Sequence, residues 1–335
     1  MKTYYVGMDV HQASIVIVVL NGAGKVVEAS TLKTGVAAIR SYLQRLRGRV
    51  FVTFEEGTQA QWLYEVVQSL VTEVIVCDPR QNRLLAVLPE ADYQALLPHL
   101  ETVVLTRGMA LYESGHAQPH LYFPASGVVS LLYLLRDGSA TEVALTGREG
   151  VVGISLFMGG GVTPSRAVVQ IPGQAWRMRA AQMDRSFDRG GVLQPLLLRF
   201  TQALITQMTQ TAVCNRHHAI DQQVCRWLLL ALDRLDSSEV PMTQERIAHL
   251  LGVRREAVTE AAGKLQAGGS IEYSRGIIRV LARAELEQRA CECYAVVRGE
   301  NDRLLPAGVM AALEPAGPAP DGRRPQAGPP SRRNR

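Results

Sequence analysis

The residues best suited to chemistry lie between Thr243 and Lys264, where arginines and carboxylates recur at helical spacing. Thr243 can cap a helix, because its side-chain oxygen can accept a hydrogen bond from a backbone N–H of the first turn. An arginine near the start of a second helix can donate two hydrogen bonds to guanine, and a glutamate can accept one from cytosine N4. These residue types predict direct reading of base edges in double-stranded DNA. The predicted DNA-contacting residues are Thr243, Arg254, Arg255, Glu256, Thr259, Glu260, Lys264 and Arg275.

The same stretch has the spacing of a helix-turn-helix. The small side chain of Ala248 lets a second helix cross the first, and Gly252 permits a tight turn between them. A chance pair of helices in a helical protein is the alternative interpretation. Residues 271–280 predict a strand, a turn and a strand, which would form a wing with Arg275 at its tip, within reach of a phosphate. Aliphatic residues would fill the core shared by the two helices, and these are Ile247, Leu251, Val253, Val258 and Ala261.

Five cysteines are spread along the chain, and their spacing argues against metal or disulfide chemistry. Their number is odd and no two of them have CxxC spacing. We therefore expect no disulfide framework, no structural zinc site and no cofactor, and a reducing cytoplasm as the compartment. No apolar run reaches the roughly 18 residues of a membrane span, and the N-terminus lacks the pattern of a secretion signal. The cysteines are Cys77, Cys214, Cys225, Cys291 and Cys293.

Composition allows sizeable cores, since 47% of the residues are hydrophobic and 20% are charged. The net charge of +5 does not by itself indicate a nucleic-acid partner. Five arginines and two acids fall in residues 314–335 and account for +3 of it. This Pro- and Gly-rich end has too few apolar residues to bury a core, so we expect a disordered tail. Contact of its arginines with DNA phosphates is the alternative.

Residues 4–83 alternate between strand and helix patterns. A β-hairpin followed by βαβα units is typical of a mixed sheet with helices on its faces. The expected strands are 5–10, 14–20, 25–30, 50–55 and 74–77, and the expected helices are 36–46 and 61–70.

The pattern changes after a helical stretch at 84–100. Residues 102–179 contain short β-branched runs separated by Gly and Pro, which is typical of a sandwich or jelly roll. Residues 195–235 have only helical spacing. A narrow apolar stripe on this helix predicts a two-stranded seam and hence a homodimer, while packing of the stripe against its own domain is the alternative. The stripe consists of Leu197, Phe200, Leu204 and Met208.

Residues 84 to about 305 resemble the Crp/Fnr family of bacterial transcription regulators. The resemblance rests on YFP and GVVS at 122–124 and 127–130, on GREGVVG at 147–153, and on the three segments following in the family's order. It implies a cyclic-nucleotide-binding-type β-roll, a long dimerisation helix and a winged helix-turn-helix. It also implies a homodimer on a palindromic operator, with RNA polymerase as a further candidate partner and an unidentified small-molecule effector.

The effector pocket departs from the cyclic-AMP-binding members of that family. Their pattern has a Gly-Glu pair for the ribose, whereas here Gly153 is followed by the apolar Ile154. Their phosphate-binding arginine is replaced by Ser165, with Arg166 one position later and so on the opposite face of a strand unless the preceding loop changes the register. We therefore expect no response to cyclic AMP. Residues 84–191 contain no cysteine, which argues against the iron–sulfur chemistry of the family's oxygen-sensing branch.

Residues 4 to about 83 resemble a family different from that of residues 84 to about 305. VGMDVH at 6–11, FEEGT at 54–58 and VCDPR at 76–80 resemble the N-terminus of insertion-sequence transposases with a RuvC-like, DEDD catalytic domain, an RNase H-like fold. The resemblance implies that Asp9 and Glu55 occupy two of four metal-binding positions. The pattern ends after Arg83 and two further aspartates are missing, so the acids would be vestigial and phosphodiester cleavage absent. A transposase-derived DNA-processing protein is the alternative function.

The expected architecture is therefore an α+β multidomain chain in which a truncated transposase fragment precedes a regulator, with the junction near residues 82–85. The expected parts are a partial RNase H-like segment at 1–83, a β-roll sensor at 84–191, a dimerisation-helix region at 192–235, a winged helix-turn-helix at 236–305 and a tail at 306–335.

Overall fold

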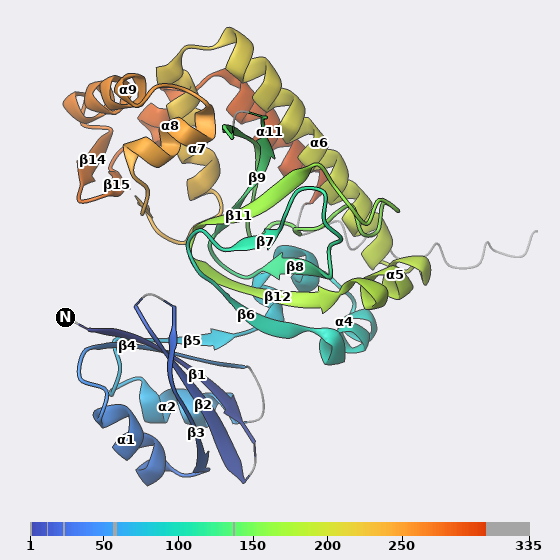
Figure 1. The fold of residues 1–335 in the computed structure, drawn as a ribbon, viewed down its shortest axis with the longest axis vertical. Helices are drawn as coiled ribbons and strands as arrows, with labels where there is room; N and C mark the ends of the chain where they lie inside the picture. The colour runs from blue at the N-terminus through green and yellow to red at the C-terminus, as the bar shows by residue number, and fades with distance from the viewer. Residues whose placement is uncertain (1, 12, 23, 56–58, 137, 306–335) are drawn as a thin grey trace, which may run out of the picture.

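The computed structural model describes residues 2–11, 13–22, 24–55, 59–136 and 138–305. Its N-terminal elements are β1 (Thr3–Val10), β2 (Ser14–Asn21), β3 (Val26–Lys33), α1 (Val36–Gln44), β4 (Arg49–Glu55), α2 (Ala60–Val67) and β5 (Glu73–Cys77). The five strands form one mixed sheet in the order β3-β2-β1-β4-β5 (Figure 1). β1, β2 and β3 are antiparallel neighbours, whereas β4 and β5 run parallel to β1. The expected mixed sheet is confirmed.

Helices cover one face of this sheet, not both as expected. Alternate residues of β1, β2 and β4 join a single core, which α1 and α2 complete through Ile39 and Leu63. On the opposite face Tyr5, Val16 and Val18 remain 36–42% exposed. The described chain supplies no further helix between α2 and β5 that could cover them.

The segment after the sheet is broken into short turns. It comprises η1 (Pro79–Gln81), α3 (Arg83–Ala86), α4 (Glu90–Leu96) and η2 (Leu97–His99), although a continuous helix was expected over residues 84–100. Pro89 and Pro98 interrupt it, because proline lacks the N–H that a helix interior needs. Asn82 is wholly buried, caps α3, and donates hydrogen bonds to the carbonyls of Pro124 and Gly150 at 3.0 and 2.8 Å. Asn82 therefore fastens the start of α3 to the β-structure that follows.

Seven strands then build the expected β-roll. They are β6 (Glu101–Leu105), β7 (Ala110–Tyr112), β8 (His120–Pro124), β9 (Val128–Leu134), β10 (Ala140–Thr146), β11 (Ser165–Ile171) and β12 (Gly173–Arg179). They pair antiparallel in two sheets, β10-β9-β11-β7 and β6-β12-β8. The core of the roll contains Leu121, Phe123, Val129 and Trp176, all at most 3% exposed.

The helices that follow the roll in the chain pack against it. They begin with α5 (Ala180–Asp188), α6 (Leu193–His217) and α7 (Ile220–Leu232). α6 extends along one side of the roll and contacts β10 (Figure 1). The last elements are β13 (Glu239–Val240), α8 (Gln244–Leu251), α9 (Arg255–Ala267), β14 (Ile271–Ser274), β15 (Ile277–Val280), α10 (Arg283–Arg289) and α11 (Glu292–Leu304).

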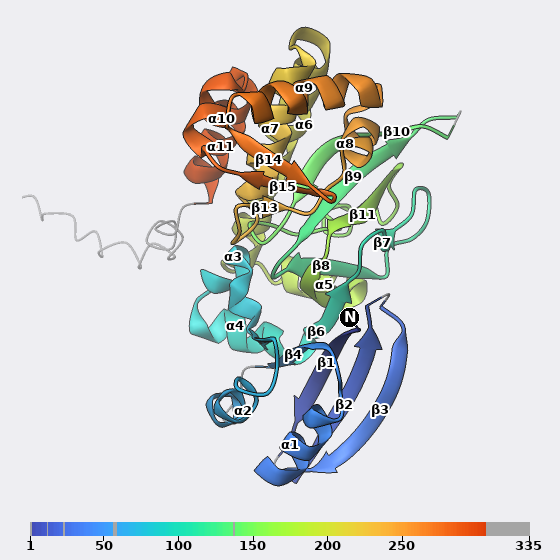
Figure 2. The ribbon, with the colours of Figure 1, turned by 90° about the vertical axis from the view of Figure 1, so that its left-hand side faces the viewer.

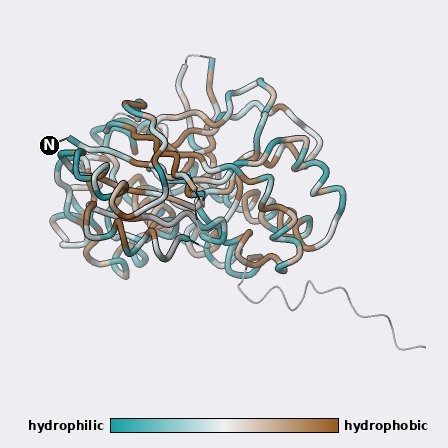
Figure 3. Tube along the Cα trace, turned by 90° about the horizontal axis from the view of Figure 1, so that it is seen from below, coloured by the Kyte–Doolittle hydropathy of each residue, from teal (hydrophilic) through white to brown (hydrophobic). Residues whose placement is uncertain are grey.

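The C-terminal elements pack back onto the rest of the chain. α11 lies against α6, and β13, β15 and β14 form a small sheet beside α8 and α9 (Figure 2). One apolar core joins Val128 and Leu132 of the roll to Trp227 of α7 and Ile247 of α8. Hydrophobic and hydrophilic stretches alternate along the trace, as amphipathic elements require (Figure 3). None of the described helices is both long and apolar enough to cross a membrane. The expected tail, residues 306–335, lies outside the described residues.

Candidate nucleic-acid interface and sensor pocket

Two short helices, α8 and α9, cross with a glycine turn between them. Thr243 caps α8, since its Oγ1 accepts a hydrogen bond from the backbone N–H of Arg246 at 3.3 Å. Gly252 has a φ of 68°, a left-handed conformation in which a side chain would be strained. Ala248 and Val258 are buried between the helices. The predicted helix-turn-helix is thus present at the predicted residues.

The outward side of α9 is polar and exposed. Arg255, Glu256, Thr259 and Glu260 line one open hollow on this side. Arg254 is exposed at the N-cap position of α9. The structure therefore brings five of the predicted DNA-contacting residues together at the N-terminal half of one helix.

Local contacts separate these side chains into two groups. Lys264 pairs with Glu260 at 2.9 Å, one helical turn away, and the Thr259 hydroxyl donates to Gln244 Oε1 at 2.9 Å. Among the described residues, neither Arg254 nor Arg255 has an ion-pair partner. The two arginines are therefore the groups most available to a base edge or a phosphate.

The wing turns sharply at Arg275. Its φ of 51° and the φ of 80° at Gly276 form a two-residue hairpin turn in which both residues are left-handed. For a residue other than glycine this conformation costs roughly 1–2 kcal/mol. Arg279, further along β15, is paired with Glu239 at 2.6 Å and with Glu272 at 3.5 Å. Arg275 is thus the exposed charge at the tip, where the sequence placed it.

The helix-turn-helix is attached to the roll through polar contacts. Arg246 Nη2 donates to Gln170 Oε1 of β11 at 3.2 Å, and Arg107 Nη2 donates to the Pro241 carbonyl at 2.8 Å. Trp227 Nε1 of α7 donates to Glu142 Oε1 of β10 at 2.9 Å. Burial raises the pKa of Glu142 to about 7. These hydrogen bonds connect the roll directly to α7, to α8 and to the segment that precedes α8.

The sequence GREG at residues 147–150 lets α6 and the end of α7 pack closely against the roll. A side chain at Gly150 would place its Cβ 1.9 Å from the Phe200 ring of α6, so only glycine lets α6 approach this closely. Glu149 is buried and pairs with the buried Arg234 at 2.7 Å. A Cβ at Gly147 would lie 2.8 Å from the Arg234 side chain. The phrase thus serves packing between the roll and α6–α7.

The first half of the expected sensor pocket has an apolar residue at the position where the cyclic-AMP-binding pattern has a glutamate that accepts from the ribose hydroxyl. Gly153 has a φ of 115° and Ile154 follows it, half-buried and packed against the core of the roll. Ser155 then donates to Gln118 Oε1 at 2.8 Å. Ile154 offers no group that could accept a hydrogen bond from a ribose hydroxyl.

The second half of the pocket has hydroxyl groups in place of an arginine. Ser165 is 7% exposed, and its Oγ lies 3.4 Å from the Tyr112 hydroxyl and 3.0 Å from Thr163 Oγ1. Burial raises the pKa of Tyr112, so this hydroxyl stays protonated. Arg166 instead donates to the exposed Glu113 at 3.0 Å. Arg166 thus lies on the face of the strand opposite to Ser165, paired with a carboxylate rather than with the buried hydroxyls.

The predicted dimer stripe is directed into the chain itself. Leu197, Phe200 and Leu204 are at most 3% exposed and belong to the core shared with the roll, and Met208 packs against that core. This corrects the assignment of the seam, since these side chains already have partners. The outer side of α6 instead exposes Leu198, Ile205 and Val213, which are 49%, 47% and 41% exposed.

The two acids of the N-terminal sheet, Asp9 and Glu55, end neighbouring strands. β1 pairs with β4 in parallel up to Met8 and Phe54, so Asp9 and Glu55 occupy the next positions of the register. Asp9 is exposed, and His11 Nε2 lies 3.1 Å from its Oδ2. The side chain of Glu55 lies outside the described part of the structure. The backbone therefore places the two acids side by side without defining a metal site.

Three of the cysteines expected to be scattered lie together in the structure. Cys214, Cys291 and Cys293 are buried beside His218, although Cys214 and Cys291 are 77 residues apart in sequence. Separate short patterns, a Cys-x-x-x-His and a Cys-x-Cys, were the available signal, and neither is distinctive alone.

Comparison with known proteins supports the two central parts of this description. Residues 102–189 match the family described as cyclic nucleotide-binding domain, and residues 222–289 match the family described as Crp-like helix-turn-helix domain. The "CRP-like cAMP-activated global transcriptional regulator" of Mycobacterium tuberculosis is 26% identical over 216 residues, which cover 58% of this chain and 91% of that relative. Neither family range includes the N-terminal sheet.

One solved structure agrees with this chain at the level of the fold. FixK2 from Bradyrhizobium japonicum superposes with a TM-score of 0.51 at 17% identity, covering 57% of this chain and 98% of FixK2. The c-di-GMP responsive regulator CLP from Xanthomonas campestris has a TM-score of 0.46 at 16% identity, covering 57% of this chain and 99% of CLP. The FixK2 comparison supports the arrangement of roll, long helix and helix-turn-helix.

Proposed function

The chain is a DNA-binding transcription regulator of the Crp/Fnr type, and on that premise we propose that it reads a two-fold symmetric operator as a homodimer, without cyclic AMP. The matched families and relatives are transcription regulators, not enzymes. The observation that carries the proposal is the exposed polar side of α9, where Arg254 and Arg255 have no ion-pair partner within the described part of the chain. The N-terminal part of a recognition helix is the part that meets base edges in the major groove.

We assign the reading of bases to α9 and the binding of phosphates to the wing. Arg255 is the proposed bidentate donor to guanine, and Glu256 is the proposed acceptor from cytosine. Arg275 at the tip of the wing is the proposed phosphate contact, which would position the protein without selecting sequence. The Lys264–Glu260 pair reduces the charge of the second turn of α9, so affinity depends mainly on the arginines.

The proposed dimer forms through the outer side of α6. Leu198, Ile205 and Val213 recur at intervals of seven and eight residues, about two helical turns, and are exposed in the single chain. A helix of 25 residues offers enough length for a two-stranded seam. A symmetric pair of α9 helices would then meet half-sites about one helical turn of DNA apart.

Independence from cyclic AMP rests on the two halves of the sensor pocket. Ile154 lacks an acceptor for the ribose, and the guanidinium of Arg166 is paired with Glu113 away from Ser165. The Ser165, Tyr112 and Thr163 hydroxyls can donate hydrogen bonds but bring no positive charge to a cyclic phosphate. Calorimetry should give no dissociation constant for cyclic AMP in or below the micromolar range.

The proposed division of the chain keeps the sequence boundaries at residues 83, 191, 235 and 305. Separate hydrophobic cores in the N-terminal sheet and the roll support the first boundary. Residues of the roll and of α7–α9 share one hydrophobic core, so the parts on either side of the later boundaries pack closely against each other. The cytoplasm is the proposed compartment, since a transcription regulator acts where the DNA is.

A truncated RNase H-like fragment is the proposed origin of the N-terminal sheet. The strand order β3-β2-β1-β4-β5, with Asp9 and Glu55 at adjoining strand ends, favours this reading. Two acids do not complete a two-metal site. A supercoiled plasmid incubated with the protein and Mg²⁺ should therefore stay un-nicked, and nicking lost in an Asp9→Asn variant would support the DNA-processing alternative.

Selection of bound DNA from a random pool tests the proposed function directly. The intact protein should enrich a palindrome whose half-sites are about 10 base pairs apart, at a stated salt concentration because affinity depends on salt. Enrichment of no sequence, or of a single asymmetric site, would contradict symmetric reading by a dimer.

A further inference from the structure

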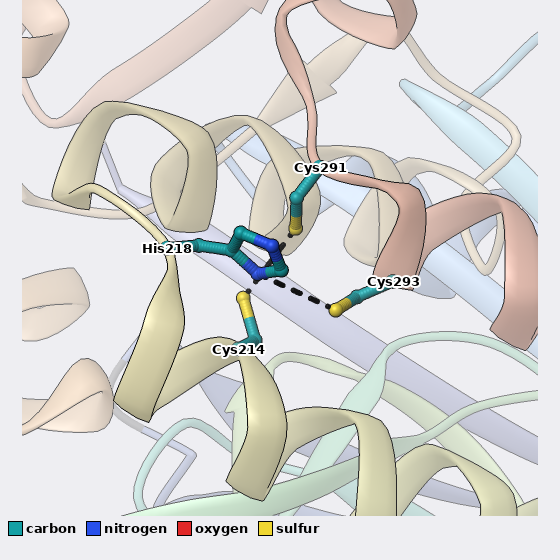
Figure 4. A group of neighbouring side chains, drawn as sticks. All are labelled: Cys214, His218, Cys291 and Cys293. Atoms are coloured by element: carbon teal, nitrogen blue, oxygen red, sulfur yellow. Dashed lines mark hydrogen bonds between the residues drawn. The ribbon is translucent and has the colours of Figure 1, made fainter.

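Four potential metal ligands converge where the end of α6 meets the start of α11. Cys214 lies in the last turn of α6 and His218 directly follows that helix. Cys291 is the N-cap residue of α11 and Cys293 lies in its first turn. Figure 4 shows the four side chains pointing toward one another. Their ligand atoms all lie within 4.8 Å of one another.

The spacing fits one tetrahedral ion. Zinc binds thiolate sulfur at about 2.3 Å and imidazole nitrogen at about 2.0–2.1 Å, so ligand atoms around it lie roughly 3.4–3.8 Å apart. Cys214 Sγ is 3.5 Å from Cys291 Sγ, and Cys293 Sγ is 3.5 Å from His218 Nδ1. A cluster of several iron atoms would separate its thiolates further than this group allows. Three cysteines and one histidine are also a ligand set of structural zinc sites.

The histidine is oriented as a metal ligand. Its Nδ1 faces Cys293, while its Nε2 lies 3.3 Å from Glu292 Oε1. Donation of the Nε2 proton to that carboxylate leaves the lone pair on Nδ1 directed into the group, an arrangement common in zinc sites. Gln223 Nε2 donates to the His218 carbonyl at 2.9 Å and so holds its backbone. The imidazole is therefore positioned from both sides.

A buried cation beside the group matches the charge of a loaded site. Three thiolates and one Zn²⁺ leave one negative charge, which would be costly in the interior without a partner. Arg226 of α7 is only 3% exposed, and its Nη1 donates to Thr211 Oγ1 at 3.2 Å. Within the described ranges no carboxylate lies at ion-pair distance from its guanidinium.

We propose that Cys214, His218, Cys291 and Cys293 bind one zinc ion, which joins the end of α6 to the start of α11. Between these two ends the chain forms α7 to α10, including the helix-turn-helix and the wing. The ion therefore closes a loop that contains the whole helix-turn-helix and wing, and it holds the two ends of that loop together. The expectation from sequence of no zinc site is replaced by this proposal, which does not depend on whether α9 reads DNA.

Metal content of the intact protein, purified under reducing conditions without chelator, tests the site. We expect one zinc per chain by mass spectrometry and three thiols that react with a thiol reagent only after a chelator removes the metal. Cobalt added to the metal-free protein should give the intense visible bands of tetrahedral coordination and a thiolate charge-transfer band. The proposal would be overturned if protein purified in this way held no stoichiometric zinc and gave no such cobalt spectrum, or if it contained a Cys214–Cys291 disulfide in place of the metal.

Variants separate the four ligands from other buried cysteines. Cys293→Ala and His218→Ala should lose the zinc, whereas Cys225→Ala removes a buried thiol of α7 outside the group and should retain it. Equal loss of zinc in Cys225→Ala and Cys293→Ala would overturn the assignment of ligands.

A variant that keeps all four ligands covers the case in which their loss prevents folding. Glu292→Ala removes only the carboxylate behind His218, on an exposed side chain. Chelator competition should show zinc affinity about 10–100-fold weaker, with circular dichroism unchanged. Unchanged affinity would contradict the role of Glu292 in positioning His218 as a ligand.

Discussion

Replacing Glu142 with glutamine should remove a pH dependence that this buried carboxyl gives to the free energy of unfolding. Glu142 is 7% exposed between β10 and α7, and burial raises its pKa from 4.5 to about 7. Hydrogen bonds from Ser130 and Trp227, and the charges of Arg226 and Arg234, oppose this rise without cancelling it. The protonated carboxyl is therefore the form that the folded state favours.

The sign and size of the effect follow from this pKa. A group whose pKa is higher in the folded state stabilises it fully below the unfolded pKa of about 4.5, and this stabilisation is lost as the pH rises through about 7. Each pKa unit corresponds to about 1.4 kcal/mol, so the change from 4.5 to about 7 is worth about 3 kcal/mol. Glutamine has nearly the same shape and does not titrate. Its amide oxygen can still accept from Trp227, and its amide nitrogen can donate to the Ser130 hydroxyl.

Urea unfolding followed by tryptophan fluorescence, repeated from about pH 5 to pH 8, measures the effect. The unfolding free energy of the wild type minus that of Glu142→Gln should fall by up to about 3 kcal/mol across this range. Ser130→Ala removes a hydrogen bond that favours the carboxylate, so the fall should extend to higher pH in that variant. A difference that stays constant with pH, or that increases with it, would refute the reasoning.

Three further results are expected. Ile205→Glu should yield monomers in sedimentation with the fold intact, whereas Leu204→Glu, one residue away but in the core, should lower the free energy of unfolding by several kcal/mol. A dimeric Ile205→Glu variant would show that the dimer seam lies elsewhere. Arg275→Asn should keep the left-handed wing turn, weaken binding to all DNA sequences alike and reduce the salt slope by about one, and a selective loss for one operator would instead make it a base contact. Gly150→Ala should cost at least about 1–3 kcal/mol, measured by thermal unfolding, because its Cβ would collide with Phe200, and full stability would show that α6 can shift away.

Local chemistry explains what the sequence predicted well. Thr243 and Gly252 act within one or two turns of their own position, so the helix-turn-helix was visible from composition and spacing alone. The opposite faces of Ser165 and Arg166 followed from strand alternation for the same reason. Helix interruption at Pro89 was available from the sequence but was overlooked within an otherwise helical stretch.

Long-range contacts account for what the sequence did not predict. α6 is apolar on two sides, and helical spacing cannot tell which side meets the roll and which is left exposed, so Leu204 and Ile205 were not distinguished. The cysteine group was missed because Cys214 and Cys291 meet only after the intervening helices have folded back. The sequence likewise did not show that helices cover only one face of the N-terminal sheet, because this depends on the path of the chain after β5.

The base preference of Arg255→Ala tests the central claim, reading of DNA by α9, most directly. Affinities of the wild type and the variant should be compared across operators mutated one base pair at a time, at several salt concentrations. The account predicts a loss of about 1–3 kcal/mol with relaxed preference at one base pair per half-site. A uniform loss on every operator, with all base preferences kept, would contradict the placement of α9 in the major groove.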